Sequence, residues 1–149
     1  MNTANAQGIV RAANKPAAAP AVTKLLTSGD QVEIHTRLDQ LNSTVSVTLK
    51  IKDGFHINAN PASLDYLIPT RIAFASVEPT SVDYPQGVEF KPSFSKSALD
   101  VYEGNTTIIA NFKAGALANK RELAATIIAQ ACNDTVCLPP SSMQVSVGQ

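Results

Sequence analysis

The residues best suited to chemistry are the only two cysteines of the chain, Cys132 and Cys137, in the stretch ACNDTVCLPP. Four residues separate them, so a bond between the two sulfurs would close a small ring. This spacing allows three interpretations: a structural disulfide, half of a metal site, or a disulfide that opens and closes by exchange. Each interpretation makes a different demand on the rest of the chain.

A purely structural disulfide would contribute little at this position. Such bonds stabilise proteins mainly by restricting the unfolded chain, and the effect grows with the length of the closed loop. The six-residue ring from 132 to 137 corresponds to only about 2 kcal/mol. The inter-sheet disulfide of antibody domains joins distant strands and packs on a tryptophan, and this chain contains no tryptophan.

The sequence also argues against a metal site. Structural zinc sites take four ligands, usually as two closely spaced pairs, whereas here one Cys-x4-Cys pair accompanies two separate histidines, His35 and His56. His35 lies on the polar side of an expected strand and should face solvent. His56 follows the turn at Asp53 and Gly54 and could approach the cysteines. We therefore expect no metal, and no cofactor other than the disulfide itself.

The local sequence favours an exchangeable disulfide. Pro139 and Pro140 tighten the short ring, and a constrained disulfide is easier to reduce than a relaxed one. The polar residues 133–135 predict a surface turn, where a thiolate can approach a sulfur in line. Asp134 would raise the pKa of a nearby thiol. We infer a domain whose partner supplies the activated thiolate.

Apolar and polar residues alternate from Asp30 onwards, which predicts β-strands. These strands must position the cysteines. In TVSVTLKI, the apolar residues Val45, Val47, Leu49 and Ile51 would face a core while those between them face solvent. About seven short strands are expected, in the segments 32–35, 44–51, 68–77, 86–90, 106–114, 122–131 and 142–147.

This pattern, with no helical period between the strands, predicts an all-β, immunoglobulin-like β-sandwich. Segment 122–131 has mixed signals, but its β-branched centre favours a strand. Residues 1–28, rich in Ala, Asn and Pro, are expected to form a flexible tail or linker, and residues 29–149 a single domain. Two irregular stretches, 58–66 and 91–104, are long for connecting loops in a sandwich, and loops of that length are often functional.

Composition excludes several classes of protein. Lysine plus arginine (12) balances aspartate plus glutamate (12), so no long-range field would attract nucleic acid. No apolar stretch approaches the roughly 18 residues that span a bilayer, so we expect a soluble domain. The sequence shows no serine, histidine and acid arrangement of recognisable spacing and no paired-carboxylate motif, which argues against a hydrolase.

Four collinear pieces of the sequence resemble a known family. They are LKIKDGFHIN (49–58), YPQGVEF (84–90), FSKSALDVYEG (94–104) and CNDTVCLPP (132–140). Together they are similar to the N-terminal periplasmic domain of the bacterial transmembrane thiol:disulfide interchange protein DsbD, over about residues 45–147. The chain departs from the best-known members in its Cys-x4-Cys spacing, which is one residue shorter, and in its longer NANPASLDYLIPT segment.

The resemblance implies a periplasmic immunoglobulin-like domain in which Cys132 and Cys137 carry reducing equivalents. The domain would take electrons from a thioredoxin-like donor, fused to or associated with a transmembrane reductase domain. It would pass them to thioredoxin-fold acceptors, including those of cytochrome c biogenesis, without any cofactor. The partner-linked cysteine is the second in the family's motif, here Cys137.

The resemblance also assigns residues around the pair. A protective cap loop, which shields the cysteines until a partner docks, corresponds to about 91–102. Its assigned residues are Phe94, the expected lid, with Ser95, Lys96 and Tyr102, and the pocket-lining residues are Phe55, His56 and Asp134. A second function stays open: a binding module with an inert structural disulfide, whose long loops recognise a partner protein.

Overall fold

The computed structural model describes residues 25–148, which form eleven β-strands and no α-helix. One 3₁₀ turn, η3 (Gly29–Gln31), precedes them. The strands are β1 (Val32–Asp39), β2 (Thr44–Ile51), β3 (His56–Asn58), β4 (Arg71–Phe74), β5 (Ser81–Asp83), β6 (Val88–Phe90), β7 (Leu99–Tyr102), β8 (Asn105–Asn111), β9 (Glu122–Ala129), β10 (Ala131–Cys132) and β11 (Ser141–Gly148). No helix in this part of the chain is long and apolar enough to cross a membrane. The predicted all-β class is confirmed.

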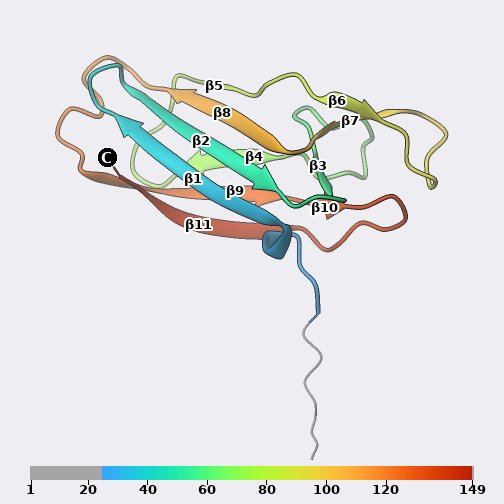
Figure 1. Cartoon of the computed structure of the whole chain (residues 1–149). Helices are drawn as coiled ribbons and strands as arrows, with labels where there is room; N and C mark the ends of the chain where they lie inside the picture. The colour runs from blue at the N-terminus through green and yellow to red at the C-terminus, as the bar shows by residue number, and fades with distance from the viewer. Residues whose placement is uncertain (1–24, 149) are drawn as a thin grey trace, which may run out of the picture.

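Two of the three sheets form the layers of a sandwich. One has the order β1-β2-β8-β5 and the other β11-β9-β4, and all pairs within them are antiparallel. Figure 1 shows the first layer above the second, with the third sheet, β10-β3-β7-β6, at one end of the molecule.

The alternation in the sequence gives the core of this sandwich. Val45, Val47 and Leu49 of β2 are completely buried, as the period-two pattern predicts, and Leu123 and Ile127 of β9 belong to the same core. Burying an aliphatic side chain of this size stabilises a fold by about 1.5–3 kcal/mol. The cysteine-bearing end is thus attached to a well-packed body.

The third sheet is assembled from continuations of the sandwich strands. β3 follows β2 after a turn at 52–55, β7 leads into β8 through a turn at 103–104, and β10 follows β9 after one residue. Gly54 and Gly104 in these turns have φ angles of 87° and 64°, a region that residues with a Cβ rarely adopt. These turns let the same chain segments serve both the body and the cysteine end.

The number of strands exceeds the seven expected. Segment 68–77 is a strand only over β4, because it begins and ends in irregular backbone. Segment 122–131 is extended as predicted, but it divides at Gln130 into β9 and β10, which belong to different sheets. Strands of three or four residues, such as β3, β5 and β7, are too short to display a period.

The expected tail, residues 1–28, lies outside the described residues up to position 24. Within the described part, Leu25 and Leu26 are exposed, whereas Ser28 is buried. The Ser28 hydroxyl donates to the Pro139 carbonyl oxygen (2.6 Å) and accepts from the Ala131 amide (2.8 Å). Ser28 therefore fixes the start of the fold to the two ends of the cysteine segment.

Candidate functional site: a cross-strand disulfide beside an apolar hollow

Cys132 and Cys137 form a disulfide across a short hairpin. The Leu138 amide donates to the Ala131 carbonyl oxygen (2.8 Å), and the Asn133 amide donates to the Val136 carbonyl oxygen (2.9 Å). The cysteines lie directly opposite each other between these two bonds, as a non-hydrogen-bonded pair. Side chains of such pairs approach most closely, which fits the Cα–Cα distance of 3.9 Å.

The tip of the hairpin is held by Asn133. Its side-chain oxygen accepts the amide hydrogens of Thr135 and Val136, both at 2.9 Å, and the Thr135 hydroxyl at 3.2 Å. An Asn side chain that bonds the backbone two residues later is a turn-forming device. The surface turn predicted for 133–135 is therefore present, and it fixes the register in which the two sulfurs meet.

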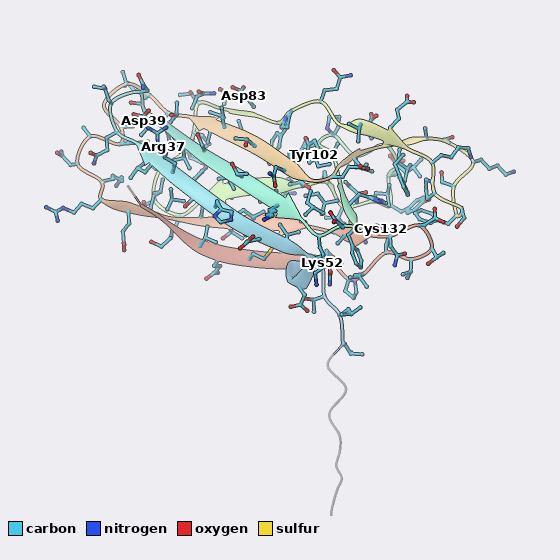
Figure 2. The ribbon with its side chains drawn as sticks, viewed as in Figure 1. Arg37, Asp39, Lys52, Asp83, Tyr102 and Cys132 are labelled. Carbon is cyan, nitrogen blue, oxygen red and sulfur yellow. A yellow bond between two sulfur atoms is a disulfide. The ribbon has the colours of Figure 1, made fainter. Side chains whose placement is uncertain are left out.

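The two cysteines differ in exposure. Cys132, in β10, is only 1% exposed, whereas Cys137 is partly exposed on the return strand of the hairpin. Figure 2 shows Cys132 at the opposite end of the sandwich from Arg37 and Asp39. An attacking thiolate needs an accessible sulfur, and of the two cysteines Cys137 is the more exposed.

Cys137 opens onto an apolar hollow of about 270 Å³. The other lining residues are Tyr66, Leu67, Phe94, Gln130, Thr135 and Val136. Three of the apolar side chains are well exposed: Tyr66 by 67%, Val136 by 49% and Phe94 by 39%. Exposed apolar side chains that gather in one patch are typical of surfaces that contact other molecules.

The cap loop is shorter than expected. The irregular segment covers 91–98, and β7 then takes residues 99–102 back into a sheet. The Ser93 hydroxyl donates to the Asp134 carbonyl oxygen (2.9 Å), so the loop is bound to the tip of the cysteine hairpin. Phe94 lines the hollow together with Cys137.

The other assigned loop residues lie elsewhere. Ser95 and Lys96 are absent from the lining of the hollow within the described chain; the Ser95 hydroxyl donates to the Ser97 carbonyl oxygen (2.9 Å), and Lys96 is exposed. The placement of Tyr102 in the loop was wrong. It belongs to β7, is buried in the main core, and donates its hydroxyl to the Pro85 carbonyl oxygen (2.8 Å). Val101, which precedes it in β7, is also buried. A strand of four residues is too short for the sequence pattern to predict this burial.

His56 is the nearest strand partner of the disulfide. It lies directly opposite Cys132 in the pairing of β10 with β3, and its ring contacts that of Phe90 with centroids 4.3 Å apart. Burial lowers the pKa of His56, an effect that the negative charge of Asp134 opposes. The Nε2 atom of His56 is buried and has no hydrogen-bond partner.

The remaining pocket residues flank this histidine. Phe55 is half-buried, packs against the main core, and lines a second hollow of about 340 Å³ together with His56, Phe90 and Glu103. Asp134 is exposed at the hairpin tip. His35 is exposed on β1 as predicted, with its Nε2 3.6 Å from a Glu33 carboxylate oxygen.

Sequence reasoning missed several residues of the site. Tyr66 ends the irregular 58–66 stretch and Leu67 follows it; the length of that stretch is typical of functional loops but does not place it beside the cysteines. Gln130 accepts hydrogen bonds from the Asn58 side chain (3.2 Å) and the Ile68 amide (3.1 Å), and so fastens that stretch beside the hairpin.

A metal site would need three or more suitable side chains together. The residues that the structure describes contain no such group of His, Cys, Asp or Glu.

The comparisons with known proteins agree with this geometry. The family model "Thiol:disulfide interchange protein DsbD, N-terminal" matches residues 23–149. The chain belongs to this family. No curated protein sequence matches it.

Solved DsbD N-terminal domains share the fold. The reduced form of the Neisseria meningitidis domain is 16% identical, with a TM-score of 0.60, covering 84% of this chain and 90% of that one. The same bacterium's domain, in its complex with the PilB N-terminal domain, is also 16% identical, with a TM-score of 0.56, covering 83% and 88%. The expected immunoglobulin-like β-sandwich is thereby confirmed.

Proposed function

We propose that this DsbD N-terminal domain is a periplasmic electron-transfer module. It takes reducing equivalents from a thioredoxin-like donor associated with a membrane reductase and passes them to thioredoxin-fold acceptors. Its redox group is the Cys132–Cys137 disulfide, and it uses no metal or other cofactor. In this scheme residues 29–149 are the exchange domain, and the tail or linker expected over 1–28 ends before the buried Ser28.

The position of Cys137 is the observation that carries this proposal. Its sulfur belongs to a disulfide at one end of the fold and lies on an apolar hollow with exposed Tyr66, Phe94 and Val136. A disulfide that served only stability would gain nothing from a surface of this kind. The solved complex of the related domain with the PilB N-terminal domain supports a protein as the partner.

A redox titration tests the proposal. The oxidised domain is equilibrated in dithiothreitol buffers of graded ratio, and alkylation followed by mass spectrometry gives the fraction of disulfide. We expect a potential above about −300 mV, because structural disulfides lie below that value. A lower potential would favour the second candidate, a binding module with an inert bridge.

A further inference from the structure

His56, Cys132 and Cys137 form one row across three neighbouring chain segments. Cys132 is opposite His56 on one side and opposite Cys137 on the other. Side chains that are directly opposed in antiparallel strands point to the same face of the sheet, with Cβ atoms about 4.5–5.5 Å apart. His56 therefore stands at the inner end of the row and Cys137 at the outer end, with the buried Cys132 between them.

A histidine is a costly residue at this inner position. Its Nε2 is buried without a hydrogen-bond partner, and leaving a buried polar group unpaired costs about 1–3 kcal/mol. A phenylalanine would pack against Phe90 without that cost. Residues that lower the stability of a fold are expected mainly at functional sites.

Once the disulfide is reduced, the Cys132 thiol needs a base, and the imidazole of His56 can act as one. Cys132 then carries a thiol that is shielded from solvent, and a thiol must lose its proton before its sulfur can attack a disulfide. Burial and nearby negative charge both disfavour the thiolate. The charge of Asp134 on the hairpin acts on His56, and two further carboxylates, Asp53 and Glu103, line the hollow that His56 shares.

Neutral imidazole is ordinarily a stronger base than a carboxylate, because the ordinary pKa of histidine, about 6.5, is above those of aspartate and glutamate, about 4. The lowered pKa of His56 keeps its ring neutral at neutral pH, so it has a free nitrogen for a proton. Asp134 stabilises the imidazolium once the proton has arrived, because its charge opposes the effect of burial.

We propose that His56 takes the proton from the Cys132 thiol when the domain reduces an acceptor, a role that rests on the proposed electron-transfer function. The Cys137 thiolate first attacks the acceptor disulfide and expels one acceptor thiolate, which leaves a mixed disulfide. His56 then removes the Cys132 proton, and the Cys132 thiolate attacks the Cys137 sulfur. The bond to the acceptor breaks, its second thiolate leaves, and the Cys132–Cys137 disulfide has passed two electrons to the acceptor.

The attack by Cys137 and the attack by Cys132 can be timed separately with dithiobis(nitrobenzoate) as the acceptor. Each attack releases one coloured thiolate, and its absorbance is measured. The reduced domain is mixed with this reagent by stopped flow over a range of pH. The variants are His56→Phe, which retains a ring against Phe90, and His56→Gln, which retains polarity. His35→Gln, at the exposed histidine of β1, is the matched control.

We expect both His56 variants to slow the second release at least about tenfold, the lower end of what a positioned base contributes. Its pH dependence should move upward towards the ordinary thiol pKa, near 8.5. The first release and the control should be unchanged.

An unaltered second release, with an unaltered pH profile, would overturn the role of His56 and leave the electron-transfer function intact. If neither variant folds, the wild-type profile decides: a second release governed by one ionisation near 8.5 would also overturn it. A wild-type domain that shows no second release would instead count against the proposed function.

Discussion

At the scale of single residues, the two sulfurs of one small ring have opposite surroundings. Cys132 belongs to a strand with buried neighbours, and Cys137 borders an apolar hollow. Exchange proceeds through a mixed disulfide, and the accessible sulfur is the one that forms it. The hairpin register produces this asymmetry, because it directs both side chains to one face but places only the return strand at the surface.

The first prediction follows from this asymmetry. Cys132→Ala should accumulate a mixed disulfide with a thioredoxin-fold protein through Cys137, because no second thiol remains to resolve it. Cys137→Ala should trap at least about tenfold less, since its remaining sulfur is buried. Non-reducing gels measure the adduct. A greater yield from Cys137→Ala would reverse the roles of the two cysteines.

The second prediction concerns His56 and the pH dependence of stability. Burial lowers its pKa in the folded domain, so between the folded and unfolded pKa values the unfolded chain binds the extra proton. The contribution of neutral His56 to the free energy of unfolding is therefore fully present above the ordinary histidine pKa, near 6.5. It decreases as the pH falls below that value. Urea unfolding of the oxidised domain at graded pH should show this loss.

Two substitutions isolate that effect. His56→Phe should have a flatter stability profile between about pH 5 and 7, because the group that titrates has been removed. His35→Gln, which changes an exposed histidine, should retain the wild-type slope. Equal slopes in all three proteins would show that His56 does not titrate differently on folding.

At the scale of elements, a loop and a hairpin from distant parts of the chain are fastened together. The Ser93 hydroxyl and amide both donate to the Asp134 carbonyl oxygen, at 2.9 and 3.4 Å. Few contacts of this kind hold segment 91–98 in place, and loops with few buried contacts open most readily. Phe94 lies in this segment, so the lid role expected for it can be tested without altering the core.

The third prediction tests Phe94 as a lid. Phe94→Ala should speed reduction of the disulfide by dithiothreitol severalfold, because it removes the ring beside Cys137. The free energy of unfolding should change by less than about 1 kcal/mol, since partly exposed side chains contribute little. Val88→Ala, at an exposed position on β6, is the control. Equal reduction rates would exclude the lid, and a large loss of stability would place Phe94 in the core.

The elements that the sequence predicted well are those with enough residues to show a period. The alternation in β2 identified its buried side chains, and Gly54 marked a turn in which its own φ angle is positive. β7 was missed because three of its four residues are buried, which leaves no alternation to detect. Tyr66 was missed because its place beside Cys137 depends on the hydrogen bonds of Gln130, which lies far along the chain.

At the scale of the whole molecule, the sandwich places the disulfide at the opposite end from one exposed apolar side chain, Leu41. Figure 1 shows the β1–β2 turn at one end and β10 with its hairpin at the other. Leu41 in that turn is 91% exposed, and Tyr66 beside Cys137 is 67% exposed. The two residues are thus a matched pair: both are large and exposed, but only Tyr66 lines the hollow beside the disulfide.

The fourth prediction uses this pair to separate docking from chemistry. Tyr66→Ala should lower the rate of exchange with thioredoxin about tenfold, equivalent to 1.4 kcal/mol, because exposed tyrosines near the centre of an interface often carry binding energy. The rate with dithiothreitol should not fall, since a small thiol needs no docking surface. Leu41→Ala should leave both rates unchanged.

If Tyr66→Ala and Leu41→Ala change the rate of exchange with thioredoxin equally, the partner does not dock over the hollow. If Tyr66→Ala slows dithiothreitol as well, the tyrosine acts on the disulfide itself and not on a partner.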